Sequence, residues 1–137
     1  MTSKPAPLLY FAYASNLNKK QMKERAPESK PRVTATLPNY RLVFAGWSRQ
    51  WHGGTATIRA SRGDKVLGGV YEVSERDLRR LDTYEAGYTH INVTVFDEDG
   101  TAIPVVTFIK SGQTEETKPS PEYLAVIQQG YRDWGIV

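Results

Sequence analysis

Positions 8–14, Leu-Leu-Tyr-Phe-Ala-Tyr-Ala, form an apolar run without a charged residue. A run of this kind, with no alternating polar positions, is typical of a strand buried on both faces. Ser15, Asn16 and Asn18 follow at once, and all three are favourable helix N-cap residues. Positions 19–26 are rich in helix-forming residues and end at a proline. The pattern predicts a central strand, a tight turn and the start of a helix.

A strand that passes through a tight turn into a helix directs unpaired backbone N–H groups, and the positive end of the helix dipole, at one point. Such a point attracts a carboxylate or a phosphate. The simpler alternative is a structural junction that binds nothing, since most junctions of this type in mixed α/β proteins have no ligand. The pattern alone leaves both interpretations open.

The rest of the chain alternates short strand patterns with two helix patterns. Ser74 and Asp77 have capping-box spacing, which predicts a helix that ends near positions 85–87, and Ser120-Pro121 opens a last helix. Glycines within the strand patterns suggest curvature, as in a small barrel. The remaining strand-like runs are 32–37, 40–47, 55–60, 66–73, 88–96 and 101–109, and turns are predicted at Pro38-Asn39 and at Arg62-Gly63-Asp64-Lys65.

These elements predict an α+β fold: a small, mostly antiparallel β-barrel of about six strands with three flanking helices. Strands and helices do not alternate regularly enough for a doubly wound sheet. We expect residues 1–7, which contain two prolines, to form a flexible N-terminal extension. Residues 8–137 are expected to form a single domain, as their number allows one core.

Composition narrows the function classes. The 137 residues include no cysteine and two histidines, which disfavours disulfides, thiolate chemistry and a histidine-rich metal site. We therefore expect no metal. The absence of cysteine also suits the reducing cytoplasm, and the apolar run near the start is too short for a membrane span, so we expect a cytoplasmic location without a membrane partner. The net charge of +3 and the pI near 9.2 invite a nucleic-acid hypothesis. The basic residues are mixed with acidic ones on the predicted helices, however, which favours solvated helix faces and no nucleic-acid partner.

Two polar positions are candidates for chemistry. Glu85 ends a predicted helix between Tyr84 and Tyr88, and a buried carboxylate there would have the raised pKa that a proton shuttle needs. An exposed helix-end glutamate with no task is the alternative. His52 precedes Gly53 and Gly54, where the backbone can approach a ligand or a neighbouring segment closely, or can simply bend a curved sheet.

The chain resembles the γ-glutamylcyclotransferases through four motifs in the same order, and the similarity extends over nearly the whole chain from Leu8. Each motif is weak alone, and the four together are specific. They are Tyr13-Ala14-Ser15-Asn16-Leu17, Trp51-His52-Gly53-Gly54-Thr55-Ala56-Thr57-Ile58, Leu81-Asp82-Thr83-Tyr84-Glu85 and Pro119-Ser120-Pro121-Glu122-Tyr123.

The resemblance implies a cofactor-free enzyme in which the glutamyl α-amine attacks its own γ-carbonyl, so that a γ-glutamyl amide yields 5-oxoproline and a free amino compound. It implies a small-molecule γ-glutamyl substrate and a monomer or homodimer. Glu85 would move the protons. The implied substrate-binding residues are Tyr13, Ala14, Ser15, Asn16, Leu17, Gly53 and Tyr88.

Two features depart from the family pattern. Ala14 stands where the family has glycine; alanine would cost about 1 kcal/mol if this position needs a positive φ, and would be tolerated if it needs only a small side chain. The segment from Glu85 to Tyr88 is short, and His90 stands near where many relatives carry arginine. A non-catalytic member that binds a γ-glutamyl or other small carboxylate ligand is therefore the main alternative to the enzyme. An RNA-binding barrel is a third, separate hypothesis.

Overall fold

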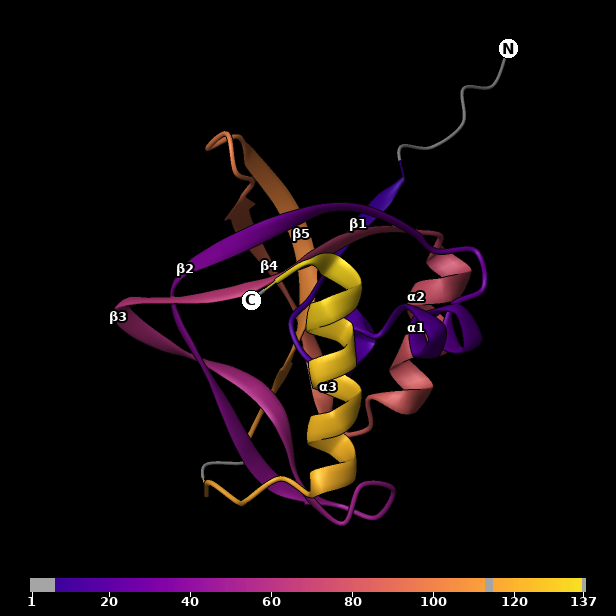
Figure 1. Cartoon of the computed structure of the whole chain (residues 1–137), viewed down its shortest axis with the longest axis vertical. Coiled ribbons are helices and arrows are strands. Elements are labelled where there is room, and N and C mark those ends of the chain that lie inside the picture. The colour runs from indigo at the N-terminus through magenta and orange to yellow at the C-terminus, as the bar shows by residue number, and fades with distance from the viewer. Residues whose placement is uncertain (1–6, 113–114, 137) are drawn as a thin grey trace.

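The computed structural model describes residues 7–112 and 115–136, so most of the expected N-terminal extension, residues 1–6, lies outside the described residues. Five strands and three α-helices, with one short 3₁₀-helix, make up this part of the chain (Figure 1). In chain order they are β1 (Leu8–Ala12), η1 (Ser15–Leu17), α1 (Lys19–Arg25), β2 (Lys30–Ser48), β3 (Gly53–Val73), α2 (Glu75–Tyr84), β4 (Tyr88–Phe96), β5 (Ala102–Lys110) and α3 (Pro121–Trp134).

The strands form a closed barrel in the order β1-β3-β2-β4-β5. All neighbouring pairs are antiparallel except β1 and β5, which pair in parallel through Tyr10 and Val106 and close the barrel. The predicted α+β class, the barrel, its mostly antiparallel order and the three helices are confirmed. The apolar run at the start of the chain lies between two neighbours, β3 and β5, as expected for a central strand.

The predicted number of about six strands is wrong for the described residues, because pairs of predicted strands are continuous. β2 runs through Pro38-Asn39 and β3 runs through the Arg62–Lys65 segment, both of which the sequence suggests are turns. The two segments lie opposite each other in one long hairpin formed by β2 and β3. The pairing is irregular there, because the register shifts between Pro38 and Tyr40. Asn39 has a φ of 65°, and its Oδ1 accepts a hydrogen bond of 3.1 Å from the N–H of Gly63. Turn-forming residues here bend a hairpin without ending its strands.

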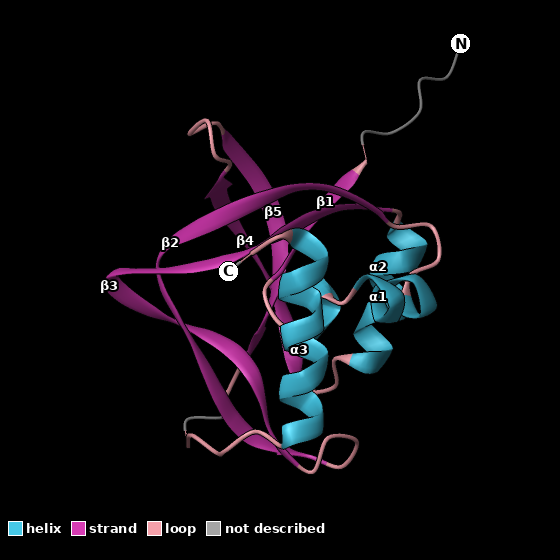
Figure 2. Ribbon diagram, in the orientation of Figure 1, coloured by secondary structure: helices cyan, strands magenta, loops and turns pink. Residues whose placement is uncertain are grey.

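The helix starts follow the predicted caps. The side chain of Asn18 accepts from the N–H of Gln21 at the start of α1, and Ser74 and Ser120 cap α2 and α3 in the same way. All three α-helices gather on one side of the strands (Figure 2). Among the described residues, no helix is long and apolar enough to cross a membrane.

Helix α3 fixes the turn after β1. Its Gly130 lies so close to η1 that a Cβ there would stand 2.6 Å from the backbone nitrogen of Asn18. Near the end of the helix, the indole N–H of Trp134 donates to the carbonyl oxygen of Leu17 at 2.8 Å. Tyr123 and Ile127 on the same helix are buried in the barrel core. The position of the turn is therefore fixed by its packing against α3.

Candidate active site

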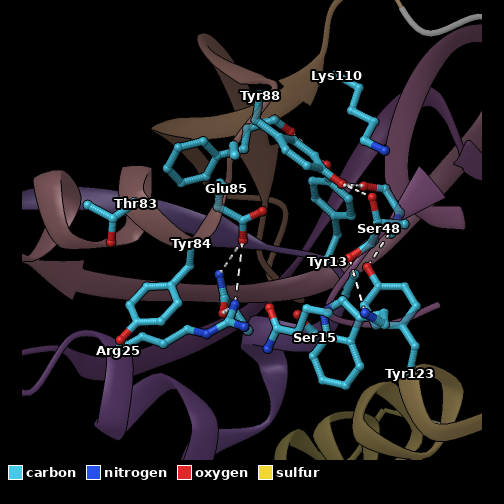
Figure 3. A pocket seen from close by; sticks show the side chains of 18 of the residues that line it. Tyr13, Ser15, Arg25, Ser48, Thr83, Tyr84, Glu85, Tyr88, Lys110 and Tyr123 are labelled. Atoms are coloured by element: carbon cyan, nitrogen blue, oxygen red, sulfur yellow. Dashed lines mark hydrogen bonds and ion pairs between the residues drawn. The ribbon is translucent and has the colours of Figure 1, made fainter. Parts of the chain in front are cut away.

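A cavity of about 430 Å³ opens beside the end of β1. Its walls come from segments far apart in the chain: the β1–η1 turn, the loop between β2 and β3, the end of α2, and the ends of β4 and β5 that meet there (Figure 3). The lining residues that bear on the chemistry are Tyr10, Tyr13, Ala14, Ser15, Asn16, Arg25, Ser48, Arg49, Trp51, Thr55, Ala56, Tyr84, Glu85, Tyr88, Lys110 and Tyr123.

The turn after β1 lines this cavity and contains backbone N–H groups at the start of a 3₁₀-helix. Its internal hydrogen bonds use the N–H groups of Leu17 and Asn18, which donate to the carbonyl oxygens of Ala14 and Ser15 at 3.0 Å. The N–H groups of Ser15 and Asn16 thus have no acceptor inside the 3₁₀-helix, as is usual at a helix start. The turn lies between β1 and α1, so these donors come from η1 and not from the start of α1, the helix that the sequence predicts after the turn.

Ala14 has a φ of −139°, outside the left-handed region. The family has glycine at this position, either because a positive φ is required or because only a small side chain fits. The first of these explanations is therefore wrong for this chain. The side chain is buried and lines the cavity, so this position needs a small residue. Alanine meets that need.

The side chain of Asn16 forms four hydrogen bonds. Its amide nitrogen donates to the hydroxyl of Tyr10 at 3.0 Å and to Oε1 of Glu85 at 3.1 Å. Its oxygen accepts from Gln21 and from Nη1 of Arg25, both at 3.2 Å. These bonds use the capacity of a side-chain amide, so Asn16 can offer a ligand its backbone N–H but not its side chain.

Glu85 lies just past the end of α2, where its N–H donates to the carbonyl oxygen of Leu81. Its side chain is 16% exposed and points into the cavity (Figure 3). Burial raises the pKa of this carboxyl, and the nearby Arg25 guanidinium, 3.9 Å from Oε1, and the Asn16 hydrogen bond offset part of that effect. A carboxyl with a raised pKa can accept and return a proton nearer neutral pH than an ordinary glutamate.

Tyrosines supply hydroxyl groups to the opposite wall. The hydroxyl of Tyr88 lies 2.9 Å from Oγ1 of Thr55 and donates to the carbonyl oxygen of Ala56, and that of Tyr123 accepts from the N–H of Ala56 at 2.9 Å. Burial raises the pKa of Tyr88 and of Tyr123. The phenols therefore stay protonated near neutral pH. Because the hydroxyl of Tyr123 accepts from the backbone, its own proton can be donated to a ligand.

The structure brings together most of the residues that the sequence suggests. Tyr13, Ala14, Ser15, Asn16, Glu85 and Tyr88 all line the cavity.

Two of the expected substrate-binding residues lie elsewhere. Leu17 is fully buried, and its carbonyl oxygen accepts from Trp134. At Gly53 a Cβ would stand 2.8 Å from the carbonyl oxygen of Lys118, so this glycine allows close packing against the segment before α3. His52, with a φ of 56°, is exposed in the β2–β3 loop and does not line the cavity.

Several cavity residues were not predicted as site residues. Arg25 is 6% exposed, and only the fold shows that this face of α1 turns toward Glu85. Lys110 ends a strand and carries no local signal. Tyr123 does lie in the fourth motif of the resemblance, so that motif could have identified it. Within residues 7–112 and 115–136, no group of three or more His, Cys, Asp or Glu side chains is placed to hold a metal ion.

Comparisons with known proteins agree with the motifs. A family model described as gamma-glutamyl cyclotransferase, AIG2-like, matches residues 10–131. Curated proteins named gamma-glutamylcyclotransferase from Homo sapiens and Bos taurus are 34% and 35% identical over 136 residues, which span 93% of this chain and 72% of each relative.

Solved structures show the same relationship. One described as gamma-glutamyl cyclotransferase superposes with a TM-score of 0.89 at 32% identity, and an uncharacterized protein from Homo sapiens does so with 0.90 at 33%. Each comparison covers 96% of this chain and 82% of the other. The chain belongs to the gamma-glutamyl cyclotransferase, AIG2-like family, and the resemblance carried by the four motifs is confirmed.

Proposed function

We propose that this chain is a γ-glutamyl cyclotransferase that converts a γ-glutamyl amide into 5-oxoproline and a free amino compound, with Glu85 as general acid and base. The observation that carries the proposal is the position of Glu85. A partly buried carboxyl with a raised pKa faces the same cavity as the backbone donors after β1, and Asn16 connects the two by a hydrogen bond. The family match supports the same activity.

The donors after β1 would bind the α-carboxylate of the glutamyl group. The N–H groups of Ser15 and Asn16 have no acceptor within their own turn, and η1 packs against α3, whose Trp134 donates to the carbonyl oxygen of Leu17. An anion that accepts from such donors in a partly desolvated cavity gains more than it would in water. Binding at this end would place the γ-carbonyl carbon of a folded substrate near Glu85.

The reaction then needs one nucleophile and one proton carrier. The α-amine of the substrate attacks the γ-carbonyl carbon, which forms the ring C–N bond, and Glu85 takes the proton that the amine loses. The γ-amide C–N bond breaks as Glu85 gives that proton to the departing nitrogen. Positioning of an intramolecular attack can lower a barrier by about 7–11 kcal/mol, so one carboxyl and a shaped cavity are sufficient protein machinery.

The alternative, a family member that binds a γ-glutamyl or other small carboxylate ligand without turnover, was suggested by two departures from the pattern. The φ of Ala14 lies outside the left-handed region that favours glycine. Despite the short segment, the Tyr88 hydroxyl reaches Thr55 and Ala56. Both observations favour the catalytic function. We propose a cytoplasmic setting, a small-molecule partner and no nucleic-acid or membrane partner, as the sequence leads us to expect.

A substrate panel tests the proposal. Purified protein is incubated with γ-glutamyl amides of amino acids, of simple amines and of the lysine ε-amine, and released 5-oxoproline is measured. Release from at least one member, abolished in the Glu85→Gln variant, supports the function. Binding of panel members by calorimetry without any release would favour the non-catalytic alternative.

A further inference from the structure

Two cationic side chains within the cavity have different surroundings. Nη1 of Arg25 lies 3.9 Å from Oε1 of Glu85 and donates to Oδ1 of Asn16, so its charge already has partners. Nζ of Lys110 donates to the carbonyl oxygen of Ala45 at 2.7 Å and lies 5.6 Å from the centre of the Tyr88 ring. In the part of the chain that the structure describes, Nζ forms no ion pair with a carboxylate.

The ammonium of Lys110 is held in place yet retains binding capacity. One of its three N–H donors is used by Ala45, which leaves two for another partner. The side chain is half-buried, and burial lowers its pKa while the charge of Glu85 opposes that effect. A desolvated cation without a counter-ion is costly, and a bound anion relieves that cost.

The position of Lys110 corresponds to the leaving-group side of the proposed reaction. In Figure 3 the Arg25 side chain lies on one side of Glu85, while Lys110 lies beyond the Tyr88 ring. If the glutamyl group extends from the turn after β1 to Glu85, the departing nitrogen must point into the remaining part of the cavity. Lys110 lines that part together with Ser48.

We propose that Lys110 is a specificity-determining residue that binds a carboxylate on the leaving group, so that the enzyme prefers γ-glutamyl amides of amino acids to those of simple amines. This role presupposes the cyclotransferase function proposed above. A neutral leaving group leaves the ammonium unpaired, and a cationic one is repelled by it. The preference therefore has an attractive and a repulsive component at one side chain.

A matched pair of substrates isolates this contact. γ-Glutamylalanine and γ-glutamylethylamide differ only by the carboxylate of the leaving group, so the ratio of their kcat/KM values reports its recognition. In wild type the ratio is expected to favour γ-glutamylalanine. Lys110→Met, which keeps the stem over Tyr88, should lower the ratio about 10- to 100-fold, the range of a hydrogen bond to a charged group. Lys65→Met, an exposed site outside the cavity, controls for the loss of one positive charge.

Charge reversal provides the second variant. Lys110→Glu should reject γ-glutamylalanine and gain relative activity toward the γ-glutamyl amide of ethylenediamine, whose leaving group carries a positive charge. An unchanged ratio in Lys110→Met overturns the inference. An equal loss for both substrates with a shifted pH profile also overturns it, since Lys110 would then act on Glu85. The inference is likewise overturned if Arg49→Met, and not Lys110→Met, lowers the ratio of the two kcat/KM values.

Failure of the proposed function gives a different result. If wild type converts neither substrate, binding of both is measured by calorimetry. Tighter binding of γ-glutamylalanine, lost in Lys110→Met, would still support the carboxylate site although the catalytic proposal fails. Equal binding of the two ligands by wild type would overturn the role of Lys110.

Discussion

The amide nitrogen of Asn16 donates a hydrogen bond of 3.1 Å to Oε1 of Glu85, across 69 positions of sequence. This bond joins the turn that presents backbone donors to the carboxyl that is proposed to carry the proton. The oxygen of the same amide accepts from Arg25, whose guanidinium lies 3.9 Å from Glu85. The proposed anion site and the proton carrier are therefore parts of one hydrogen-bonded unit.

The first prediction is that Glu85→Gln lowers the rate of 5-oxoproline release by at least about 100-fold, because general acid–base catalysis contributes about 10²–10⁴. Glutamine keeps an oxygen that can accept from Asn16, so the fold should be retained. Release is measured by chromatography and folding by circular dichroism. A folded variant with more than about a tenth of the wild-type rate would exclude a proton-carrying role.

A second prediction concerns stability. The folded-state pKa of Glu85 is raised above its ordinary value of 4.5, mainly by burial. The carboxyl thus contributes most stability below pH 4.5, when it is neutral in both states, and loses that contribution as pH rises through the folded-state pKa. Glu85→Gln should therefore raise the Tm relative to wild type at pH 7, and the difference should shrink toward pH 4. A difference that grows on acidification would contradict the burial of this charge.

The third prediction uses Arg25 as a probe of the pKa of Glu85. Its guanidinium lowers that pKa, so Arg25→Met should raise it and move the acid limb of the kcat/KM profile to higher pH. Arg25→Lys keeps the positive charge and serves as the matched control, with a smaller displacement expected. The profile is measured from pH 4 to pH 8 on one γ-glutamyl substrate. Identical acid limbs in wild type and Arg25→Met would show that another group governs the limb.

Local signals in the sequence were reliable where local chemistry decides the structure. Asn18, Ser74 and Ser120 each cap the helix that they were expected to cap, because an N-cap depends on a few neighbouring residues. Turn signals failed at Pro38-Asn39, where a positive φ at Asn39 serves an irregularity inside a long hairpin. The same residue types suit both structures, and only the partner strand decides between them.

The candidate site was predicted in part for a similar reason. Glu85 and the turn residues belong to contiguous motifs, so the resemblance identified them. Arg25 and Lys110 reach the cavity only because the barrel brings together the end of α1 and the end of β5. Gly53 does allow a close approach of the backbone, as its glycine suggested. The neighbour is the backbone at Lys118, however, and no local pattern specifies that contact.

A fourth prediction concerns the packing behind the turn. Alanine at an exposed position of a helix would be favoured over glycine by about 1 kcal/mol. At Gly130, however, a Cβ would stand 2.6 Å from the backbone nitrogen of Asn18, and overpacking of this kind costs about 1–3 kcal/mol. Gly130→Ala should therefore lower the free energy of unfolding in urea and also reduce activity, since η1 must move. Gln128→Ala, at an exposed position of α3, is the control and should change little. A stabilised Gly130→Ala variant with full activity would refute the close contact.

The last prediction concerns the α-carboxylate of the substrate. If the backbone N–H groups of Ser15 and Asn16 bind it, a γ-aminobutyryl amide, which keeps the amine and the γ-carbonyl, should cyclise at least about tenfold less efficiently than the γ-glutamyl amide of the same amine. The loss arises because the donors of the turn remain unpaired in a partly desolvated cavity. The two substrates are compared by kcat/KM with wild-type protein.

Variants of the turn test the same contact from the protein side. Ser15→Ala keeps the backbone donors, so its kcat/KM should fall by less than about threefold. Ala14→Gly should also be mild, because the φ of −139° does not exclude alanine and the change adds no atoms. Ala14→Val should be the most harmful, since its branched side chain enters a buried wall of the cavity and crowds the ligand. If the γ-aminobutyryl amide is converted within about threefold of the γ-glutamyl amide, less than about 1 kcal/mol depends on the carboxylate, and the turn from Tyr13 to Leu17 has another purpose.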